Sequence, residues 1–330
     1  MERVFLDVRL RQHGQDGYKS MKPNLKVGLS VIVPVYNSGA ILAQLVGRLE
    51  AVLVKIGMPF EIILINDGSQ DQSWAVIEEM AKKKDWMRGF CLMRNFGQHN
   101  ALLAGIRAAR HEVIVTIDDD LQTPPEEIVP LLARLTKSVD LVYGIPIRRN
   151  HNILRNTSSA MTRLSLTPFI GMQNARIVSS FRIFRTQLRE AFQNFNDSFV
   201  SIDVILSWGT QKVGFGEVQH KKRAYGQSSY TFFKLANHAI IMFTGFSTWP
   251  LRLASLIGML FTSFGLVVLI YVIVTYIRNG GSVPGFPFLA SIIAIFSGAQ
   301  LFALGVIGEY IAKIYIRSMN RPNYTIKETT

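Results

Sequence analysis

The sequence predicts an α/β fold with a mostly parallel sheet, followed by an interfacial helix and two transmembrane helices. The first observation is that short β-rich runs alternate with longer amphipathic runs over the first half of the 330-residue chain. Such alternation is typical of a parallel sheet whose two faces are covered by helices. The second observation is a pair of long runs without charged residues near the end of the chain, which are typical of membrane-spanning helices.

Strands are expected at residues 29–35, 60–65, 87–93, 113–117 and 141–143, where β-branched and other apolar residues gather in short runs. Helices are expected at residues 41–56, 74–83, 99–110 and 125–135. In the first of these, apolar residues recur every three or four positions. The last begins at Pro124 and Pro125, where proline is typical of a first helical turn.

Polar motifs follow the first four strands at the points where each strand ends. They are Tyr36-Asn37, Asn66-Asp67-Gly68-Ser69, Arg94-Asn95-Phe96-Gly97 and Asp118-Asp119-Asp120. Ligands of such folds bind at the carboxyl ends of the parallel strands. We therefore expect a ligand site that is built from these four motifs.

The acidic triplet indicates a metal site. Alternation at the end of a strand places Asp118 and Asp120 on one side of the chain. Two carboxylates this close repel each other unless a cation lies between them, and a hard divalent ion with phosphate oxygens as further ligands suits that need. The alternative is a solvated acidic loop. The other two motifs are less specific: Asp67 and Gly68 could contact a ribose or base or form a plain turn, and Tyr36 could stack on a base or pack internally.

The charge of the chain is concentrated in one segment. Of a formal net charge of +13, residues 145–235 contribute +9, with 13 Lys or Arg against four acids. A basic face of this kind suits nucleic acid, anionic lipid or a phosphorylated substrate. The single cysteine, Cys91, excludes an internal disulfide, and its apolar neighbours predict that it lies in the core. Residues 1–24 lack an apolar stretch and are expected to form a mobile tail, not a signal peptide.

Two uncharged runs predict membrane spans at residues 253–277 and 286–307. The first would be about 37 Å long as a helix, which exceeds the roughly 30 Å of a bilayer core. Two buried helices of a soluble protein are the alternative. Residues 231–250 mix apolar residues with Lys234 and His238, so we expect an interfacial amphipathic helix there, with a core helix as the alternative.

Basic residues flank the two spans unequally. Several precede the first span or follow the second, whereas the loop between them holds only Arg278. The flanking residues are Lys221, Lys222, Arg223, Lys234 and Arg252 on one side, and Lys313, Arg317, Arg321 and Lys327 on the other. The positive-inside rule then predicts that both termini are cytoplasmic and that the loop is external.

The motifs VIVPVYN, INDGS, RNFGQHNA and IDDDLQTPPEE, in this order, closely resemble the family 2 glycosyltransferases with a GT-A fold. Three later segments, KRAYGQSSY at 222–230, TWPLR at 248–252 and GEYIAKIY at 308–315, resemble the polyprenyl-phosphate glycosyltransferase branch of that family. This branch includes bactoprenol glucosyltransferases and dolichyl-phosphate mannose synthases. The resemblance extends from about Leu29 to Tyr324.

This resemblance implies a Rossmann-like GT-A catalytic domain at residues 25–230, with a nucleotide half at 25–145 and an acceptor half at 146–230. The interfacial helix at 231–250, the membrane region at 251–312 and a cytoplasmic tail at 313–330 would follow. It implies metal-dependent, inverting transfer of a hexose or pentose from a UDP- or GDP-linked donor to an undecaprenyl- or dolichyl-type phosphate. The reaction would take place at the cytoplasmic face of the bacterial inner membrane, for envelope glycan or lipid modification. Mg²⁺ or Mn²⁺ is the implied cofactor, no nucleic acid is involved, and a homo-oligomer is compatible with the family.

The resemblance also implies roles for individual residues. Asp118, Asp120 and Gln122 would hold the metal, and Asp118, Asp120 and Arg223 would be the catalytic residues. The nucleotide-sugar would be bound by Pro34, Tyr36, Asn37, Asp67, Gly68, Gly97, Gln98 and Asp119. The acceptor phosphate would be bound by Arg182, Arg185, Lys222, Arg223 and Ser228, because guanidinium groups suit phosphate oxygens.

Three positions depart from the family pattern. Ser38 stands where the first motif usually continues with Glu, and Ser229 stands where a Lys or Arg is usual. The family generally has an Asp shortly before the Phe-Arg that matches Phe181-Arg182, whereas residues 171–189 contain no acid. One alternative is therefore a catalytically impaired membrane scaffold that binds nucleotide-sugar. The other is a processive polysaccharide synthase, but the Gln-x-x-Arg-Trp motif of those enzymes is missing from this sequence.

Overall fold

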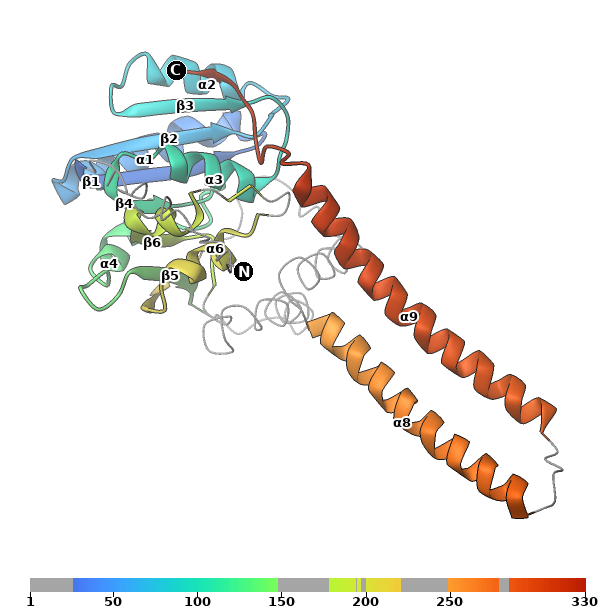
Figure 1. The fold of residues 1–330 in the computed structure, drawn as a ribbon. Helices are drawn as coiled ribbons and strands as arrows, with labels where there is room; N and C mark the ends of the chain where they lie inside the picture. Colours follow the sequence, from blue (N-terminus) through green and yellow to red (C-terminus); the bar gives the residue numbers. More distant parts are fainter. Residues whose placement is uncertain (1–25, 148–177, 194, 197–199, 221–248, 279–284) are drawn as a thin grey trace, which may run out of the picture.

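A computed structural model describes residues 26–147, 178–193, 195–196, 200–220, 249–278 and 285–330 of the chain. The predicted tail at 1–24, most of the predicted interfacial helix, and the predicted acceptor residues Lys222, Arg223 and Ser228 lie outside the described residues. The described part consists of a domain built on one sheet, here called the sheet domain, and two long helices that extend away from it (Figure 1).

The sheet has eight strands in the order β7-β5-β6-β4-β1-β2-β3-β8 among the described residues. Their bounds are β1 (Lys26–Val35), β2 (Phe60–Asn66), β3 (Met87–Leu92), β4 (His111–Thr116), β5 (Leu141–Pro146), β6 (Arg182–Arg185), β7 (Val213–Val218) and β8 (Ile326–Thr329). The pairs β1–β2, β1–β4, β2–β3 and β5–β7 are parallel. β6 runs antiparallel to both β4 and β5, and β8 runs antiparallel to β3, so the sheet is mixed but mostly parallel.

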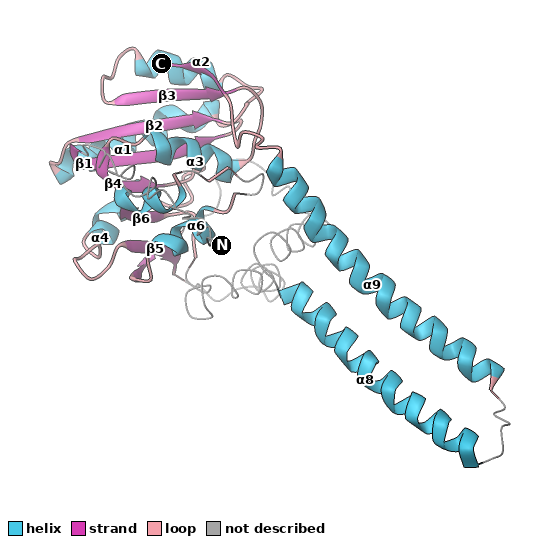
Figure 2. Cartoon of the chain, in the orientation of Figure 1, coloured by secondary structure: helices cyan, strands magenta, loops and turns pink. Residues whose placement is uncertain are grey.

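Helices cover both faces of the sheet (Figure 2). One face packs against α1 (Gly39–Ile56), α2 (Ser73–Ala81) and α4 (Ile128–Leu132), and the other against α3 (Gln98–Ala108), η3 (Thr186–Phe192) and α6 (Ile202–Gly209). Each face of the sheet has its own hydrophobic core. Successive side chains along β1 point to opposite faces, so Val31 and Val33 lie in the first core and Ile32 lies in the second. The α/β fold class predicted from the sequence is therefore confirmed.

The helix predicted at 125–135 is shorter than expected. A 3-10 helix, η1 (Pro125–Glu127), leads into α4, and tight turns follow, in which Arg134 N donates to Leu131 O and Leu135 N to Leu132 O. Pro130 lies inside α4 and has no amide hydrogen to donate, which weakens a longer regular helix at this place.

Two long apolar helices follow the sheet domain, α8 (Trp249–Arg278) and α9 (Phe286–Ser318). They run side by side (Figure 1), and the rings of Phe261 and Phe296 meet edge to face with centroids 5.7 Å apart. Segments 250–278 and 295–318 are long and apolar enough to cross a membrane, and neither is buried inside the protein. The two predicted spans are thus present as helices, although α9 extends to Ser318, beyond the predicted start of the tail at residue 313.

The end of the chain returns to the sheet domain, where the sequence pattern predicts no element. β8 pairs with β3, and Gly89 and Thr330 exchange hydrogen bonds of 2.7 and 3.1 Å. The Trp74 indole donates to Glu328 Oε2 at 2.8 Å, and Met93 N donates to Thr325 O at 2.9 Å. The segment after α9 therefore covers the edge of β3 and connects α9 directly to the sheet domain.

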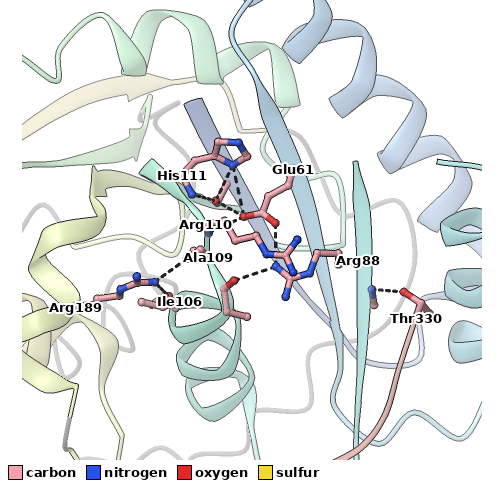
Figure 3. A network of polar contacts seen from close by, with 11 residues as sticks. Glu61, Arg88, Ile106, Ala109, Arg110, His111, Arg189 and Thr330 are labelled. Atoms are coloured by element: carbon pink, nitrogen blue, oxygen red, sulfur yellow. Dashed lines mark hydrogen bonds and ion pairs between the residues drawn. The ribbon is translucent and has the colours of Figure 1, made fainter. Parts of the chain in front are cut away.

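A buried polar network lies at the amino ends of the parallel strands, away from the predicted site (Figure 3). Glu61 accepts hydrogen bonds from Ser30 Oγ at 2.7 Å, Arg110 N at 2.7 Å and Arg88 Nη1 at 3.0 Å. Burial alone would raise the pKa of Glu61, but these hydrogen bonds and the Arg88 charge outweigh it, so the pKa lies below its usual value. The carboxylate is therefore charged and fully paired, and the network fastens β1, β2 and β3 to one another.

Candidate active site

A cleft of about 260 Å³ opens beyond the carboxyl ends of β1, β2, β3 and β4. Four predicted motifs supply its walls, which confirms that the strand ends build one pocket. Its lining residues are Pro34, Val35, Tyr36, Asp67, Asn95, Gly97, Gln98, Asp118, Asp119 and Asp120. Of these, Val35 and Asn95 were not predicted as site residues, although both belong to motifs recognised in the sequence, VIVPVYN and RNFGQHNA.

Asp67 fixes the loop between β3 and α3. Its two carboxylate oxygens accept the main-chain N–H groups of Phe96 at 2.7 Å and Gly97 at 2.9 Å. Burial raises the pKa of Asp67, although these hydrogen bonds and the Arg94 charge work against the rise. Gly68 has a φ of +66°, and a Cβ there would lie 2.5 Å from the main chain of Arg94. The Asp67-Gly68 pair therefore allows two strand-end loops to approach closely, and Asp67 itself lines the cleft.

The loop after β1 is fastened to the loop after β2. Asn37 adopts a left-handed backbone conformation, with a φ of +52°. Its main-chain N–H donates to Ser69 Oγ at 2.9 Å, and its side-chain oxygen accepts from Gln70 N at 2.8 Å. Asn37 therefore connects the two loops, whereas the neighbouring Tyr36 is 48% exposed and lines the cleft. The exposed Tyr36 ring is available for stacking on a flat ligand.

The acidic triplet gathers three carboxylates in one wall of the cleft. Asp119 Oδ2 accepts the main-chain N–H of Tyr36 at 3.1 Å, and Asp120 Oδ1 accepts that of Gln122 at 3.1 Å. Burial raises the pKa of Asp119 to about 6, and the charges of Asp118 and Asp120 add to the rise, while hydrogen bonds oppose it. Three like charges thus meet in a partly desolvated wall, and a cation would relieve their repulsion.

The oxygen-rich character of this wall fits a hard divalent cation. In the part of the chain that the structure describes, no three His, Cys, Asp or Glu side chains form a complete metal cage. A cation bound by Asp118 and Asp120 would thus complete its shell with water or with ligand oxygens, as Mg²⁺ commonly does with phosphates. Gln122 lies beside this pair, with its main chain bonded to Asp120.

The structure brings Arg182 to this edge of the sheet but not Arg185. Arg182 is 2% exposed, and its guanidinium contacts Asp203 Oδ1 at 3.4 Å and Ser179 O at 3.1 Å. Arg185 lies at the other end of β6, next to Asp140 at 3.3 Å. Sequence reasoning did not identify Asp203, which lies on α6 and also accepts a 3.1 Å hydrogen bond from Tyr143. Only the fold brings these residues together.

Comparison with solved structures finds similarity to glucosyl-3-phosphoglycerate synthase from Mycobacterium tuberculosis, in complex with Mn²⁺, uridine diphosphate and glucosyl-3-phosphoglycerate. The two chains are 14% identical, with a TM-score of 0.48, over 66% of this chain and 78% of the synthase. A complex of the same synthase with Mn²⁺ and UDP-glucose has the same TM-score and identity.

Sequence comparison gives much stronger matches. The chain is 33% identical to the undecaprenyl-phosphate 4-deoxy-4-formamido-L-arabinose transferase of Shewanella sediminis, over 93% of this chain and 94% of the relative. Proteins of the same name from Proteus mirabilis and Pseudomonas aeruginosa are 33% and 32% identical, each over more than nine-tenths of both chains. The family described as Glycosyl transferase family 2 matches residues 30–195, which include every residue that lines the cleft. The chain therefore belongs to glycosyl transferase family 2.

Proposed function

We propose that this protein transfers a sugar from a nucleotide-sugar to a polyprenyl phosphate at the cytoplasmic face of a membrane. The observation that carries the proposal is a family 2 cleft with three clustered carboxylates, in a chain that continues into two membrane-length helices. The relatives are named for undecaprenyl phosphate and 4-deoxy-4-formamido-L-arabinose. This pentose is consequently the first donor sugar to test, with UDP and GDP as the two nucleotides to compare.

The cleft residues have distinct tasks in this proposal. Tyr36 stacks on the base, and the loop that Asp67 holds closes around the nucleotide. Asp118 and Asp120 would hold Mg²⁺ or Mn²⁺. When bound, the cation would supply positive charge that stabilises the departing nucleotide diphosphate. Asp119 keeps its position by accepting the main-chain N–H of Tyr36, which ties the metal wall to the base-binding loop.

A phosphate acceptor needs no general base, which would explain why residues 171–189 can lack the acidic residue that is usual in the family. A sugar hydroxyl needs a general base, but a phosphate monoester has a second pKa of about 6 and is largely a charged nucleophile at neutral pH. It needs a fixed place and balancing positive charge. Lys222 and Arg223 supply that charge, and the two membrane helices hold the cleft at the lipid surface. Direct attack by the phosphate on the anomeric carbon would then invert its configuration.

The reaction is tested with the purified full-length protein in detergent, undecaprenyl phosphate, Mn²⁺ and each nucleotide-sugar. We expect a lipid-linked sugar in the mass spectrum, and a much higher lipid-phosphate KM for Arg223→Ala with donor binding changed less. Neutral undecaprenol is the control acceptor and should give no product. If undecaprenol serves as well as the phosphate, the acceptor proposal is wrong. A protein that binds donor without hydrolysis or transfer would instead be a scaffold.

The charges that flank the helices support a topology with a cytoplasmic sheet domain and an external loop between α8 and α9. A cysteine introduced by Ser282→Cys, in a background that carries Cys91→Ser, should react with a membrane-impermeant thiol reagent added to intact cells. The same replacement at Ser318, which ends α9 beside the sheet domain, should react only after the membrane is opened. The reverse pattern of labelling would rule out this topology.

A further inference from the structure

The Asp118 carboxylate is held by two donors from separate parts of the fold. Gln98 Nε2, at the start of α3, donates to Oδ1 at 2.7 Å, and Ser180 Oγ, just before β6, donates to Oδ2 at 2.6 Å. An ionised carboxylate has about four lone-pair sites, which is more than these two hydrogen bonds use. We propose that Ser180 is a positioning residue that orients Asp118 for cation binding, an inference that rests on the metal-dependent function proposed above.

The register of the sheet places Ser180 opposite Asp118. β4 and β6 are antiparallel, with Ile114 opposite Phe184 and Thr116 opposite Arg182. If this register is continued for two residues past Thr116 and two residues before Arg182, Asp118 lies opposite Ser180. Directly opposed residues have Cβ atoms about 5 Å apart, close enough for a hydroxyl to reach a carboxylate. A carboxylate at position 180 would repel Asp118 in the absence of a cation, whereas the serine hydroxyl binds it.

The main chain around Ser180 is fixed by its own contacts. Thr116 Oγ1 donates to Ser180 O at 2.8 Å, and Arg182 Nε donates to Ser179 O at 3.1 Å. Phe181 N donates to Ser179 Oγ at 3.3 Å, which closes the turn. The hydroxyl of Ser180 is therefore presented to Asp118 by a segment that three hydrogen bonds hold in place. Residues that orient a metal ligand in this way typically change metal affinity 10–100-fold when they are replaced.

The test measures Mn²⁺ binding in detergent for four full-length proteins: the wild type, Ser180→Ala, Ser180→Thr and Ser207→Ala. Electron paramagnetic resonance of the free Mn²⁺ reports how much of the ion is bound. We expect Ser180→Ala to bind Mn²⁺ about 10–100-fold more weakly than the wild type. Ser180→Thr keeps the hydroxyl and should restore most of the affinity. Ser207→Ala removes a hydroxyl that donates only to Val204 O in α6, and it should bind Mn²⁺ as the wild type does. Unfolding temperatures of all four proteins show whether each variant is folded.

The outcomes separate this inference from the proposed function. If the wild type binds Mn²⁺ and transfers sugar while a folded Ser180→Ala binds Mn²⁺ equally well, Ser180 has no positioning role and the function stands. If folded Ser180→Thr is as weak as Ser180→Ala, the hydroxyl is not the group that matters, and the inference is again wrong. If the wild type binds no Mn²⁺ and its transfer survives chelation, the metal-dependent function fails and the role of Ser180 fails with it.

Discussion

Asp120→Asn is expected to lower sugar transfer about a hundredfold or more while the protein stays folded. Charge stabilisation by a bound metal contributes several kcal/mol to such reactions, and about 1.4 kcal/mol corresponds to a factor of ten in rate. Asparagine keeps the size of the side chain and an oxygen that can accept the Gln122 main-chain N–H, which Asp120 Oδ1 accepts at 3.1 Å. The substitution thus removes the charge that would hold a cation and leaves the local hydrogen bond in place.

The measurement is the initial rate of lipid-linked sugar formation at several Mn²⁺ concentrations, together with the unfolding temperature. Asp85→Asn is the matched control, because Asp85 lies before the amino end of β3, at the other end of the parallel strands. Its rate should stay within about twofold of the wild type, since exposed charges away from the site have little effect. A wild-type rate for Asp120→Asn, or wild-type turnover that survives exhaustive chelation, would contradict the metal role of the triplet.

The four neighbouring parallel strands β1 to β4 could be predicted because each is marked by a local sequence pattern, whereas β7, which pairs in parallel with β5, was not predicted. β1, β2, β3 and β4 each coincide with a short apolar run, and the polar residues at their ends meet at one edge of the sheet. Cys91 was predicted to lie in the core, and it is buried in β3. The two membrane-length helices could also be predicted, since uncharged runs of this length are rare in soluble domains.

The antiparallel pairings could not be predicted, because they depend on long-range register. β6 has only four residues, and nothing local shows that its approach brings Ser180 to Asp118, 62 residues away. β8 is a short, largely exposed edge strand with the charged residues Lys327 and Glu328, a composition that does not indicate a strand. The role of Asp67 could not be predicted either, since the two main-chain N–H groups that it accepts belong to the loop after a different strand, β3.

Arg182→Met is expected to destabilise the sheet domain by about 3–5 kcal/mol, because it leaves Asp203 buried without its cationic partner. The side chains of Arg182 and Asp203 are 2% and 8% exposed, and their nearest charged atoms lie 3.4 Å apart. Burial raises the pKa of Tyr143 well above its usual value, so its hydroxyl stays a donor to Asp203 and cannot replace the lost charge. At about 2–4 °C per kcal/mol, the unfolding temperature in detergent should fall by about 6–20 °C.

The double variant Arg182→Met, Asp203→Asn should recover part of this loss, because the asparagine is neutral and can still accept the Tyr143 hydrogen bond. Arg185→Met is the matched control on the same strand. Arg185 also pairs with an aspartate, but the side chains of Arg185 and Asp140 are 35% and 23% exposed, so its loss should cost no more than about 1 kcal/mol.

The same variants decide what Arg182 does for transfer. The buried Arg182 side chain donates to Ser179 O and so supports the segment that carries Ser180, which in turn binds Asp118. Loss of Arg182 should therefore lower both the stability of the protein and its Mn²⁺ affinity. A residue that bound the acceptor phosphate directly would behave differently: its loss would raise the lipid-phosphate KM and leave stability and Mn²⁺ affinity nearly unchanged. Thermal unfolding, Mn²⁺ titration and lipid-phosphate kinetics of Arg182→Met therefore separate the two roles, and an unchanged unfolding temperature would exclude the buried ion pair as its main task.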